Sequence, residues 1–419
     1  MNLPMKTASL LKLFAALAVS AATVAPAGAG TNQLESFTLD QALEMAERLH
    51  PDLAEGKALV EAAEGRARQA GAFPNPDAIA RIEQAPFKGR TLGEAEYLTG
   101  IAQPVPLGSR LSKARAAEQL ERERRVKELE VKRRDLRRRV HGAFATALYQ
   151  DRAWQTQGEI TATVEKVAAT TKARVDAGDA LPEDLARAEM ELARAKVERQ
   201  RAACLREQAT VALAAAMGDA TLRVKSLEGS LDTTFEIPTL ESLAANLATQ
   251  PEMALAEADI RTRNARVDLA KAERVPDVRV ELLYRRLEAS KENTFDVGLS
   301  IPLPLFDRNQ GRLREARAEA AAAEARSRST QNELTFRLRE AHAQLTAALN
   351  NSRTLKTEIL PRADTVLKSA EARFAAGDTS LGDVLPVRRD WAAVQLTHLE
   401  SLRDVMQAWA QLQVFGKTR

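Results

Sequence analysis

The feature that most constrains the fold of this chain is an internal duplication with an offset close to 200 residues. The landmarks recur in the same order in the two halves: Pro51 and Pro251, Pro-Val-Pro-Leu at 104–107 and Pro-Leu-Pro-Leu at 302–305, and Arg-Val-Asp-Ala-Gly-Asp at 174–179 and Arg-Phe-Ala-Ala-Gly-Asp at 373–378. A fixed order of matching landmarks predicts two copies of one structural unit. We place the first repeat at 30–218, an irregular connector at 219–238 and the second repeat at 239–419.

Each repeat has the same predicted plan. A helix leads into a pair of strands, a very long helix follows, and a glycine turn reverses the chain into a return helix. In the first repeat these elements are expected at 38–72, 76–104, 109–176 and 181–217, with the tip near Gly178. In the second repeat they are expected at 239–275, 276–302, 308–376 and 380–415, with the tip near Gly377.

The two long helices set the scale of the molecule. A helix of about 68 residues reaches roughly 100 Å, which is longer than a globular core needs. Within 109–176 the apolar positions follow spacings of three and four, as in Leu136, Val140, Phe144 and Leu148, with charged residues elsewhere. That narrow stripe, with only 4% aromatic residues in the chain, is typical of helix-on-helix packing. The fold class is therefore mainly α with a small β part.

The strand pairs show period-two alternation. Val278, Val280, Leu282 and Tyr284 share one face of a strand, and the run from 294 to 301 alternates apolar with polar or small residues. Strands of this length can cross an outer membrane when tilted, although a soluble hairpin has the same pattern. Four strands cannot close a barrel, and open edges cannot face lipid. Three copies would supply twelve strands, so a membrane role requires a homotrimer.

The amino-terminal segment 1–29 is typical of a secretory signal peptide, with two lysines before the apolar run 13–24 and small residues after it. A transmembrane anchor is the alternative, but the apolar run is too short for one. No later run of about 18 apolar residues occurs. Cys204 is the only cysteine, so an intramolecular disulfide is impossible. The chain is thus expected to be exported without a helical anchor.

Three segments resemble the TolC-like outer-membrane efflux family, in its branch of cobalt–zinc–cadmium and other heavy-metal exporters. They are Ala-Gly-Ala-Phe-Pro-Asn-Pro at 70–76, Ile-Ala-Gln-Pro-Val-Pro-Leu-Gly at 101–108, and Leu-Ser-Ile-Pro-Leu-Pro-Leu-Phe-Asp-Arg-Asn-Gln-Gly at 299–311. The resemblance implies a trimer in the outer membrane of a Gram-negative bacterium, with a twelve-stranded barrel above a twelve-helix periplasmic tunnel. It also implies a periplasmic membrane-fusion adaptor and a proton-driven inner-membrane pump of the resistance-nodulation-division class as partners. The duct itself would be passive, without a cofactor.

The same resemblance assigns roles to the helical tips. It implies a gate and an adaptor contact at the tips, which are here Gly178 with Asp179 and Gly377 with Asp378. It implies a pore-facing carboxylate at Asp383, with Asp184 as its counterpart in the first repeat. Three copies of Asp383 would form a ring that attracts cations and holds protons more tightly than an isolated aspartate. A second acidic ring one turn later is not available, because that position is Pro386.

Other classes of function have little support in the sequence. The arginines between 133 and 139 stand beside several glutamates, so they indicate a solvated helix face and no nucleic acid. The four histidines are not closely paired and no cysteine or methionine cluster accompanies them, so no metal site is expected. No catalytic arrangement suggests an enzyme. Two alternatives to heavy-metal export stay open: a duct for organic compounds and a periplasmic coiled-coil adaptor or scaffold.

Overall fold

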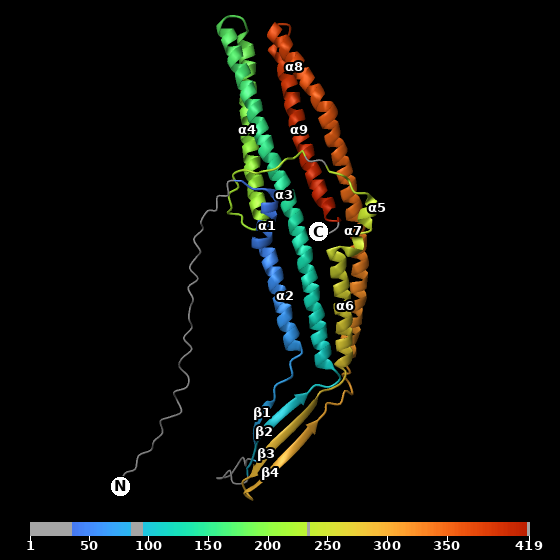
Figure 1. Ribbon diagram of the computed structural model, residues 1–419. Helices are drawn as coiled ribbons and strands as arrows, with labels where there is room; N and C mark the ends of the chain where they lie inside the picture. The colour runs from blue at the N-terminus through green and yellow to red at the C-terminus, as the bar shows by residue number, and fades with distance from the viewer. Residues whose placement is uncertain (1–35, 85–94, 233–234, 417–419) are drawn as a thin grey trace, which may run out of the picture.

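The computed structural model describes residues 36–84, 95–232 and 235–416, and it has an elongated shape with helices over most of its length and a small sheet at one end (Figure 1). The expected signal peptide at 1–29 lies outside the described residues. The two repeats stand side by side, and their long hairpins end together at the end of the molecule that is farthest from the sheet (Figure 1).

The helices follow the predicted plan, with additional breaks near Pro51, Pro251 and Pro361. In the first repeat they are α1 (Leu39–Leu49), α2 (Pro51–Ala70), α3 (Arg110–Asp176) and α4 (Pro182–Ala216). In the second repeat they are α5 (Leu240–Ala244), the 3₁₀ turn η1 (Leu247–Thr249), α6 (Pro251–Ala272), α7 (Gln310–Thr354), the π-helical turn η2 (Leu355–Ile359), α8 (Leu360–Ala376) and α9 (Leu381–Gln413).

The prediction of one opening helix per repeat, at 38–72 and 239–275, was wrong because of the two matching prolines. Proline has no N–H and disfavours helical geometry in the residue before it. His50 and Gln250 are accordingly extended, with ψ angles of 126° and 144°. Pro51 and Pro251 then begin α2 and α6, since proline at the first helical position loses no hydrogen bond.

The expected strand pairs form one antiparallel sheet of four strands. The strands are β1 (Asp77–Glu83), β2 (Glu96–Val105), β3 (Val278–Leu287) and β4 (Glu292–Ser300), in the order β1-β2-β3-β4. The join between the repeats is β2 against β3, with Gly100 opposite Leu283. A Cβ at Gly100 would lie 2.1 Å from the carbonyl oxygen of Leu282, so only glycine permits this close approach. Within the described part of the chain, strands β1 and β4 are the open edges of this sheet.

Helix α3 is the centre of the helical part. It packs against α2 and α4 of its own repeat and against α6 and α9 of the second. Its predicted stripe is buried: Leu136, Val140, Phe144 and Leu148 are all at most 2% exposed. The connector crosses the middle of the molecule, where Phe235 stacks on Trp409 of α9 with ring centroids 4.7 Å apart. Among the described residues, every helix is too short or too polar to span a bilayer.

Candidate gate and conduit

The two helical tips are closed by the same backbone device. Gly178 and Gly377 adopt left-handed conformations, with φ of +81° and +84°. The next residue in each tip donates a backbone hydrogen bond to a carbonyl five residues earlier: Asp179 to Arg174 at 2.8 Å and Asp378 to Arg373 at 2.9 Å. This is the glycine cap that ends many helices. The structure therefore confirms the predicted glycine turns, and the roles of these four residues in adaptor contact stay predictions.

Asp383 is exposed in the first turn of α9 and has hydrogen-bond partners within its own tip. Its Oδ2 accepts from the hydroxyls of Ser380 at 2.7 Å and Thr379 at 3.1 Å, and from the backbone N–H of Ser380 at 3.2 Å. The hydrogen bonds from Ser380 and Thr379 hold the pKa of Asp383 below its ordinary value. This lowering of the pKa, which arises inside each protomer, acts against the rise in pKa that a ring of three Asp383 carboxylates would cause.

Asp184 takes the equivalent position in α4 but has a different setting. It is half-buried, three residues after Leu181, which has no hydroxyl to offer it. In the described part of the chain, neither Asp184 nor Asp383 forms an ion pair that joins the hairpins. The role of Asp184 at the gate therefore stays a prediction.

Other residues join the two hairpins just behind the tips. Ala168 and Ala188 of the first hairpin pack against Leu381 and Leu385 of the second in one apolar cluster. The guanidinium of Arg389 lies 3.6 Å from the carboxylate of Glu191, which is almost fully buried on α4. This apolar cluster and ion pair hold the start of α9 against the start of α4.

A cation–π contact also joins the two hairpins: the guanidinium of Arg174 lies 5.6 Å from the ring centroid of Phe374. Sequence reasoning missed these joining residues. One signal was available: Glu191 lies on the same helical face as Ala188 and Ala195, where a charged residue needs a partner.

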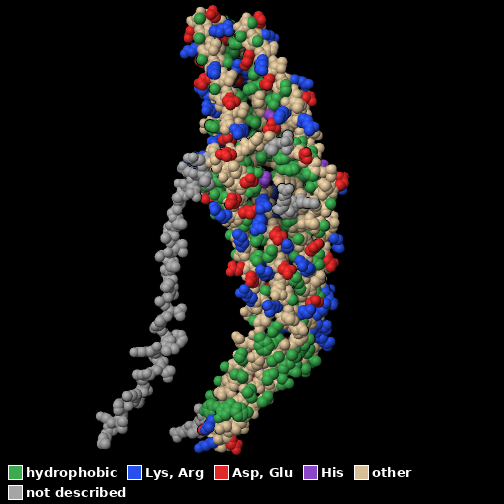
Figure 2. All heavy atoms as spheres, in the orientation of Figure 1, with side chains coloured by type: hydrophobic (Ala, Val, Ile, Leu, Met, Phe, Trp, Pro, Cys, Tyr) green, Lys and Arg blue, Asp and Glu red, His purple; other side chains and the backbone are tan. Residues whose placement is uncertain are grey.

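The sheet has two chemically distinct faces. The face that carries Ile82, Ile101 and Leu282 continues across β4 through Phe295, Val297 and Leu299, which are 73%, 78% and 68% exposed. The space-filling view shows hydrophobic side chains gathered on the sheet end and charged ones spread over the helices (Figure 2). An apolar face this exposed needs a non-aqueous environment or a partner.

The opposite face of the sheet carries carboxylates held by arginines. Arg285 lies 2.6 Å from Asp296 and 3.7 Å from Glu83, and it also pairs with Glu96. Arg279 contacts Asp77 at 3.1 Å and Glu281 at 2.9 Å. Two guanidiniums thus serve five carboxylates, so this cluster has a net negative charge.

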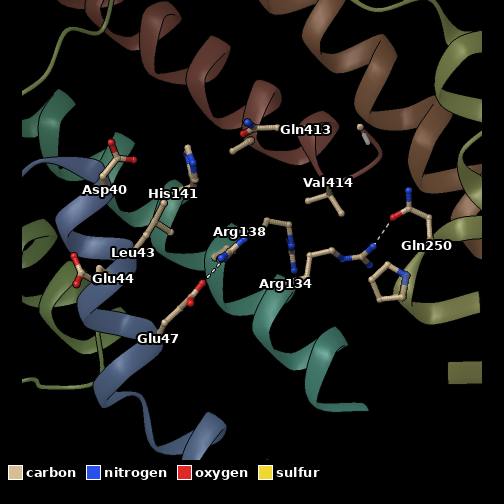
Figure 3. A pocket seen from close by; sticks show the side chains of 14 residues that line it. Asp40, Leu43, Glu44, Glu47, Arg134, Arg138, His141, Gln250, Gln413 and Val414 are labelled. Carbon is tan, nitrogen blue, oxygen red and sulfur yellow. Dashed lines mark hydrogen bonds and ion pairs between the residues drawn. The ribbon is translucent and has the colours of Figure 1, made fainter. Parts of the chain in front are cut away.

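A cleft of about 610 Å³ lies between the repeats at mid-height, lined by α1, α3, the start of α6 and the end of α9 (Figure 3). Arg134 of α3 crosses it, donates to Gln250 at 2.6 Å and forms an ion pair with Glu252. Burial lowers the pKa of Arg134 to about 10, so it stays charged at neutral pH. Burial also lowers the pKa of the neighbouring His141, which favours the neutral imidazole.

Of the charged residues that line this cleft, Arg134 pairs across the repeats with Glu252, and Arg137 pairs with Glu47 of its own repeat. In the part of the chain that the structure describes, no group of three or more histidine, cysteine, aspartate or glutamate side chains is placed to hold a metal ion. We therefore interpret the cleft as a structural joint between the repeats.

The chain matches the family described as "Outer membrane efflux protein" twice, at residues 42–219 and 243–415. It is 29% identical over 394 residues to the cobalt-zinc-cadmium resistance protein CzcC of Cupriavidus metallidurans, covering 92% of this chain and 93% of that protein. It is 32% identical over 299 residues to the nickel and cobalt resistance protein CnrC of the same organism, covering 70% and 69%.

A solved structure with the same fold is the outer membrane channel CmeC of Campylobacter jejuni. The TM-score is 0.77 at 14% identity, with 90% of this chain and 85% of that chain covered. The two family matches coincide with the duplicated halves of the structure, and the solved channel has the same fold as this chain. The chain therefore belongs to the outer membrane efflux protein family and is an outer-membrane efflux channel with a periplasmic helical extension, not an enzyme.

Proposed function

We propose that three copies of this chain form a passive duct that carries divalent heavy-metal cations across the outer membrane. A periplasmic membrane-fusion adaptor and a proton-driven inner-membrane pump of the resistance-nodulation-division class would deliver the cations. The observation that carries the choice of cargo is the similarity to the cobalt-zinc-cadmium resistance protein CzcC over nearly the full length of both chains. TolC-like channels form trimers, which supports the stoichiometry.

The open edges of the sheet support the trimer. Among the residues that the structure describes, strands β1 and β4 each leave one row of backbone groups unpaired, and unpaired groups are costly in a lipid environment. When β4 of each copy pairs with β1 of the next, the unpaired backbone groups of both strands form hydrogen bonds. The apolar face of the sheet then lies on the outside of the closed barrel. The face with the five carboxylates then lines the interior.

The charge of that interior supports a cationic cargo. Five carboxylates share Arg279 and Arg285, so three copies of the cluster add a negative field inside a narrow passage. A low-dielectric wall strengthens such a field, which concentrates cations and repels anions. The proposed ring of Asp383 at the helical tips would act in the same direction at the other end.

The test measures the mass of the detergent-solubilised protein and its ion selectivity in a planar bilayer under a salt gradient. We expect a trimer with a reversal potential of cationic sign. Asp383→Asn removes the charge but keeps an oxygen that accepts from Ser380, whereas Asp383→Ala removes both. Both variants are expected to lower the ratio of cation to anion permeability severalfold, and only Asp383→Ala should also loosen the tip. Unchanged selectivity in both variants would overturn the role of Asp383.

The cargo itself is tested in cells. Deleting the gene is expected to lower tolerance to cobalt, zinc or cadmium, and expressing the wild-type chain should restore it. Metal tolerance that does not change, together with greater sensitivity to organic toxicants, would favour the duct for organic compounds. A monomer or dimer that never conducts would reject the duct.

A further inference from the structure

An exposed apolar loop joins the sheet to the long helix of the second repeat. This loop is the run Ile-Pro-Leu-Pro-Leu-Phe at 301–306, between β4 and α7. Leu303 is 75% exposed, Leu305 is 63% exposed and Phe306 is 92% exposed. The matching loop of the first repeat is better covered, since its Leu107 is 40% exposed. A contiguous exposed apolar segment of this kind marks a surface that meets a partner or a membrane.

The apolar loop continues the apolar face of the sheet. Alternate residues carry the large apolar side chains from the strand into the loop, and all of them are exposed: Phe295, Val297, Leu299, Ile301, Leu303 and Leu305. The space-filling view shows hydrophobic side chains reaching from the sheet to the start of the helices (Figure 2). Because the chain is an outer-membrane channel with a periplasmic helical extension, this end of the apolar face lies on the periplasmic side of the membrane.

The chain becomes basic directly after the apolar loop. Arg308 precedes α7, and Arg314 and Arg317 lie in the first eight residues of that helix. All three are exposed, and among the residues that the structure describes none of their guanidiniums has a carboxylate partner. We call these three residues the basic cluster. Arg312 differs from them, because its guanidinium lies 3.7 Å from the carboxylate of Glu273.

The first cations of the other long helix already have counter-ions within the protomer. At the start of α3, Arg110 lies 2.7 Å from Asp277 and Lys113 lies 4.0 Å from Asp268. The basic cluster is thus open to an anion from outside the protomer. In Figure 2, basic side chains border the hydrophobic ones where the sheet end meets the helices.

The spacing of the apolar loop and the basic cluster fits the layers of a membrane surface. Arg317 comes seven residues after Gln310, the first residue of α7, which is about 10 Å along the helix axis. The headgroup region adds roughly 5–8 Å on each side of the hydrocarbon core. With Phe306 at the border of the hydrocarbon, long arginine side chains can reach the phosphate groups, which guanidiniums bind through two parallel hydrogen bonds.

We propose that the apolar loop and the basic cluster form a binding surface for anionic phospholipids in the periplasmic leaflet of the outer membrane. The loop lies among the acyl chains, and the guanidiniums of Arg308, Arg314 and Arg317 bind the headgroup phosphates. The occupant is a lipid because the loop continues the face of the sheet that meets lipid. This inference rests on the outer-membrane location and on neither the cargo nor the role of Asp383.

A lipid titration tests the basic cluster. The detergent-solubilised protein receives either phosphatidylglycerol or phosphatidylcholine, and the midpoint of thermal unfolding is followed because a ligand of the folded state raises it. We expect phosphatidylglycerol to raise the midpoint more strongly. An arginine near an anionic lipid surface strengthens binding about fivefold. The combined variant Arg308→Gln, Arg314→Gln and Arg317→Gln should therefore need at least about tenfold more phosphatidylglycerol for the same rise.

Arg328→Gln is the matched control for this titration. Arg328 is exposed on α7, has no ion pair with another described residue and comes eleven residues after Arg317, roughly 16 Å further from the membrane. It should bind phosphatidylglycerol like the wild type. An unchanged affinity in the combined variant, an equal loss in Arg328→Gln, or an equal rise with inorganic phosphate would overturn the proposal. A combined variant that loses the wild-type mass in detergent but still binds phosphatidylglycerol normally would assign the arginines to a neighbouring copy, which also overturns it.

Fluorescence quenching tests the apolar loop without changing the arginines. Phe306→Trp is reconstituted in vesicles that contain a brominated phospholipid, and the wild type gives the background from its three tryptophans. We expect the added fluorescence to be largely quenched. The control is Phe336→Trp, because Phe336 is 60% exposed and comes 26 residues after Gln310, about 40 Å along α7. An unquenched tryptophan at 306, or equal quenching at 306 and 336, would show that the loop does not enter the lipid.

Discussion

The two long hairpins start from one duplicated plan and differ in continuity. Helix α3 runs from Arg110 to Asp176 without interruption. Its counterpart in the second repeat starts and ends at equivalent positions but consists of α7, the π-helical turn η2 and α8. Proline explains the difference, because Pro361 stands at the start of α8 whereas α3 contains no proline. Helix α9 also contains a proline, Pro386, which α4 lacks at the equivalent position.

The same duplicated plan therefore gives two different arms. We call the hairpin of α3 and α4 the rigid arm, and the hairpin of α7, η2, α8 and α9 the hinged arm. A π turn widens the helix locally and leaves space for a residue that cannot complete the normal hydrogen-bond pattern. Side-chain contacts surround the hinge: Lys356 lies 2.5 Å from Asp232 of the connector, and Trp391 donates to Asp364 at 2.6 Å. We therefore expect the second hairpin to bend at 355–361 while the first stays straight.

The largest effect is expected from giving the rigid arm the proline of the hinged arm. Thr161 is 3% exposed, and its hydroxyl donates to the carbonyl of Gln157 at 2.7 Å. Thr161→Pro removes a backbone donor and places the ring against that carbonyl, which costs about 3 kcal/mol or more inside a helix. The measurement is the free energy of unfolding of the detergent-solubilised protein.

Thr161→Ala is the control, because it removes the hydroxyl and leaves the backbone donor in place. A Thr161→Pro protein as stable as Thr161→Ala would mean that α3 also forms a wide turn without cost. In that case the contrast between the two arms would not depend on position 361.

The next effect concerns a position where the repeats differ in chemistry. Arg134 of α3 pairs with Glu252 across the cleft between the repeats, whereas its counterpart Leu334 is buried among apolar residues. Arg134→Ala leaves Glu252 largely buried without its charge partner, and breaking such a pair costs about 3 kcal/mol. The double substitution Arg134→Met with Glu252→Leu removes both charges and should be much closer to wild type. Thermal unfolding of the two variants checks this, and equal losses would contradict it.

Much of this fold follows from the sequence because the two halves carry redundant signals. The strand pairs show period-two alternation, the long helices show a regular stripe, and Gly178 and Gly377 mark the turns. The breaks at Pro51 and Pro251 could also have been predicted, since proline restricts the residue before it. The π turn at 355–359 could not, because Pro361 alone is compatible with a kink, a helix end or a wider turn.

The candidate gate was less predictable than the fold. The identity of Asp383 is visible in the sequence, but its hydrogen bonds to Ser380 and Thr379 depend on the local geometry of the tip. Arg389 and Glu191 are 198 positions apart in the sequence. Predicting their ion pair requires knowing that the two tips lie at the same height. Contacts between elements depend on packing, which local sequence patterns do not specify.

The smallest expected effect transfers a feature from the second repeat to the first. Ser109 and Asn309 precede the two long helices, and both are left-handed, with φ of +63° and +60°. Asparagine tolerates this conformation better than serine, and Asn309 also donates to the carbonyl of Ala270 at 2.9 Å. Ser109→Asn is therefore expected to stabilise the protein by about 0.5–1 kcal/mol, measured by chemical unfolding.

Asn309→Ser is the reciprocal variant, and it should lose stability because it also removes the hydrogen bond to Ala270. If both Ser109→Asn and Asn309→Ser destabilise the protein, then each of these two residues is suited only to the repeat in which it occurs. The two junctions would then have diverged in their packing and not only in their backbone strain. If Ser109→Asn stabilises as expected, the duplicated junctions remain interchangeable, and the divergence of the repeats is concentrated in the arms.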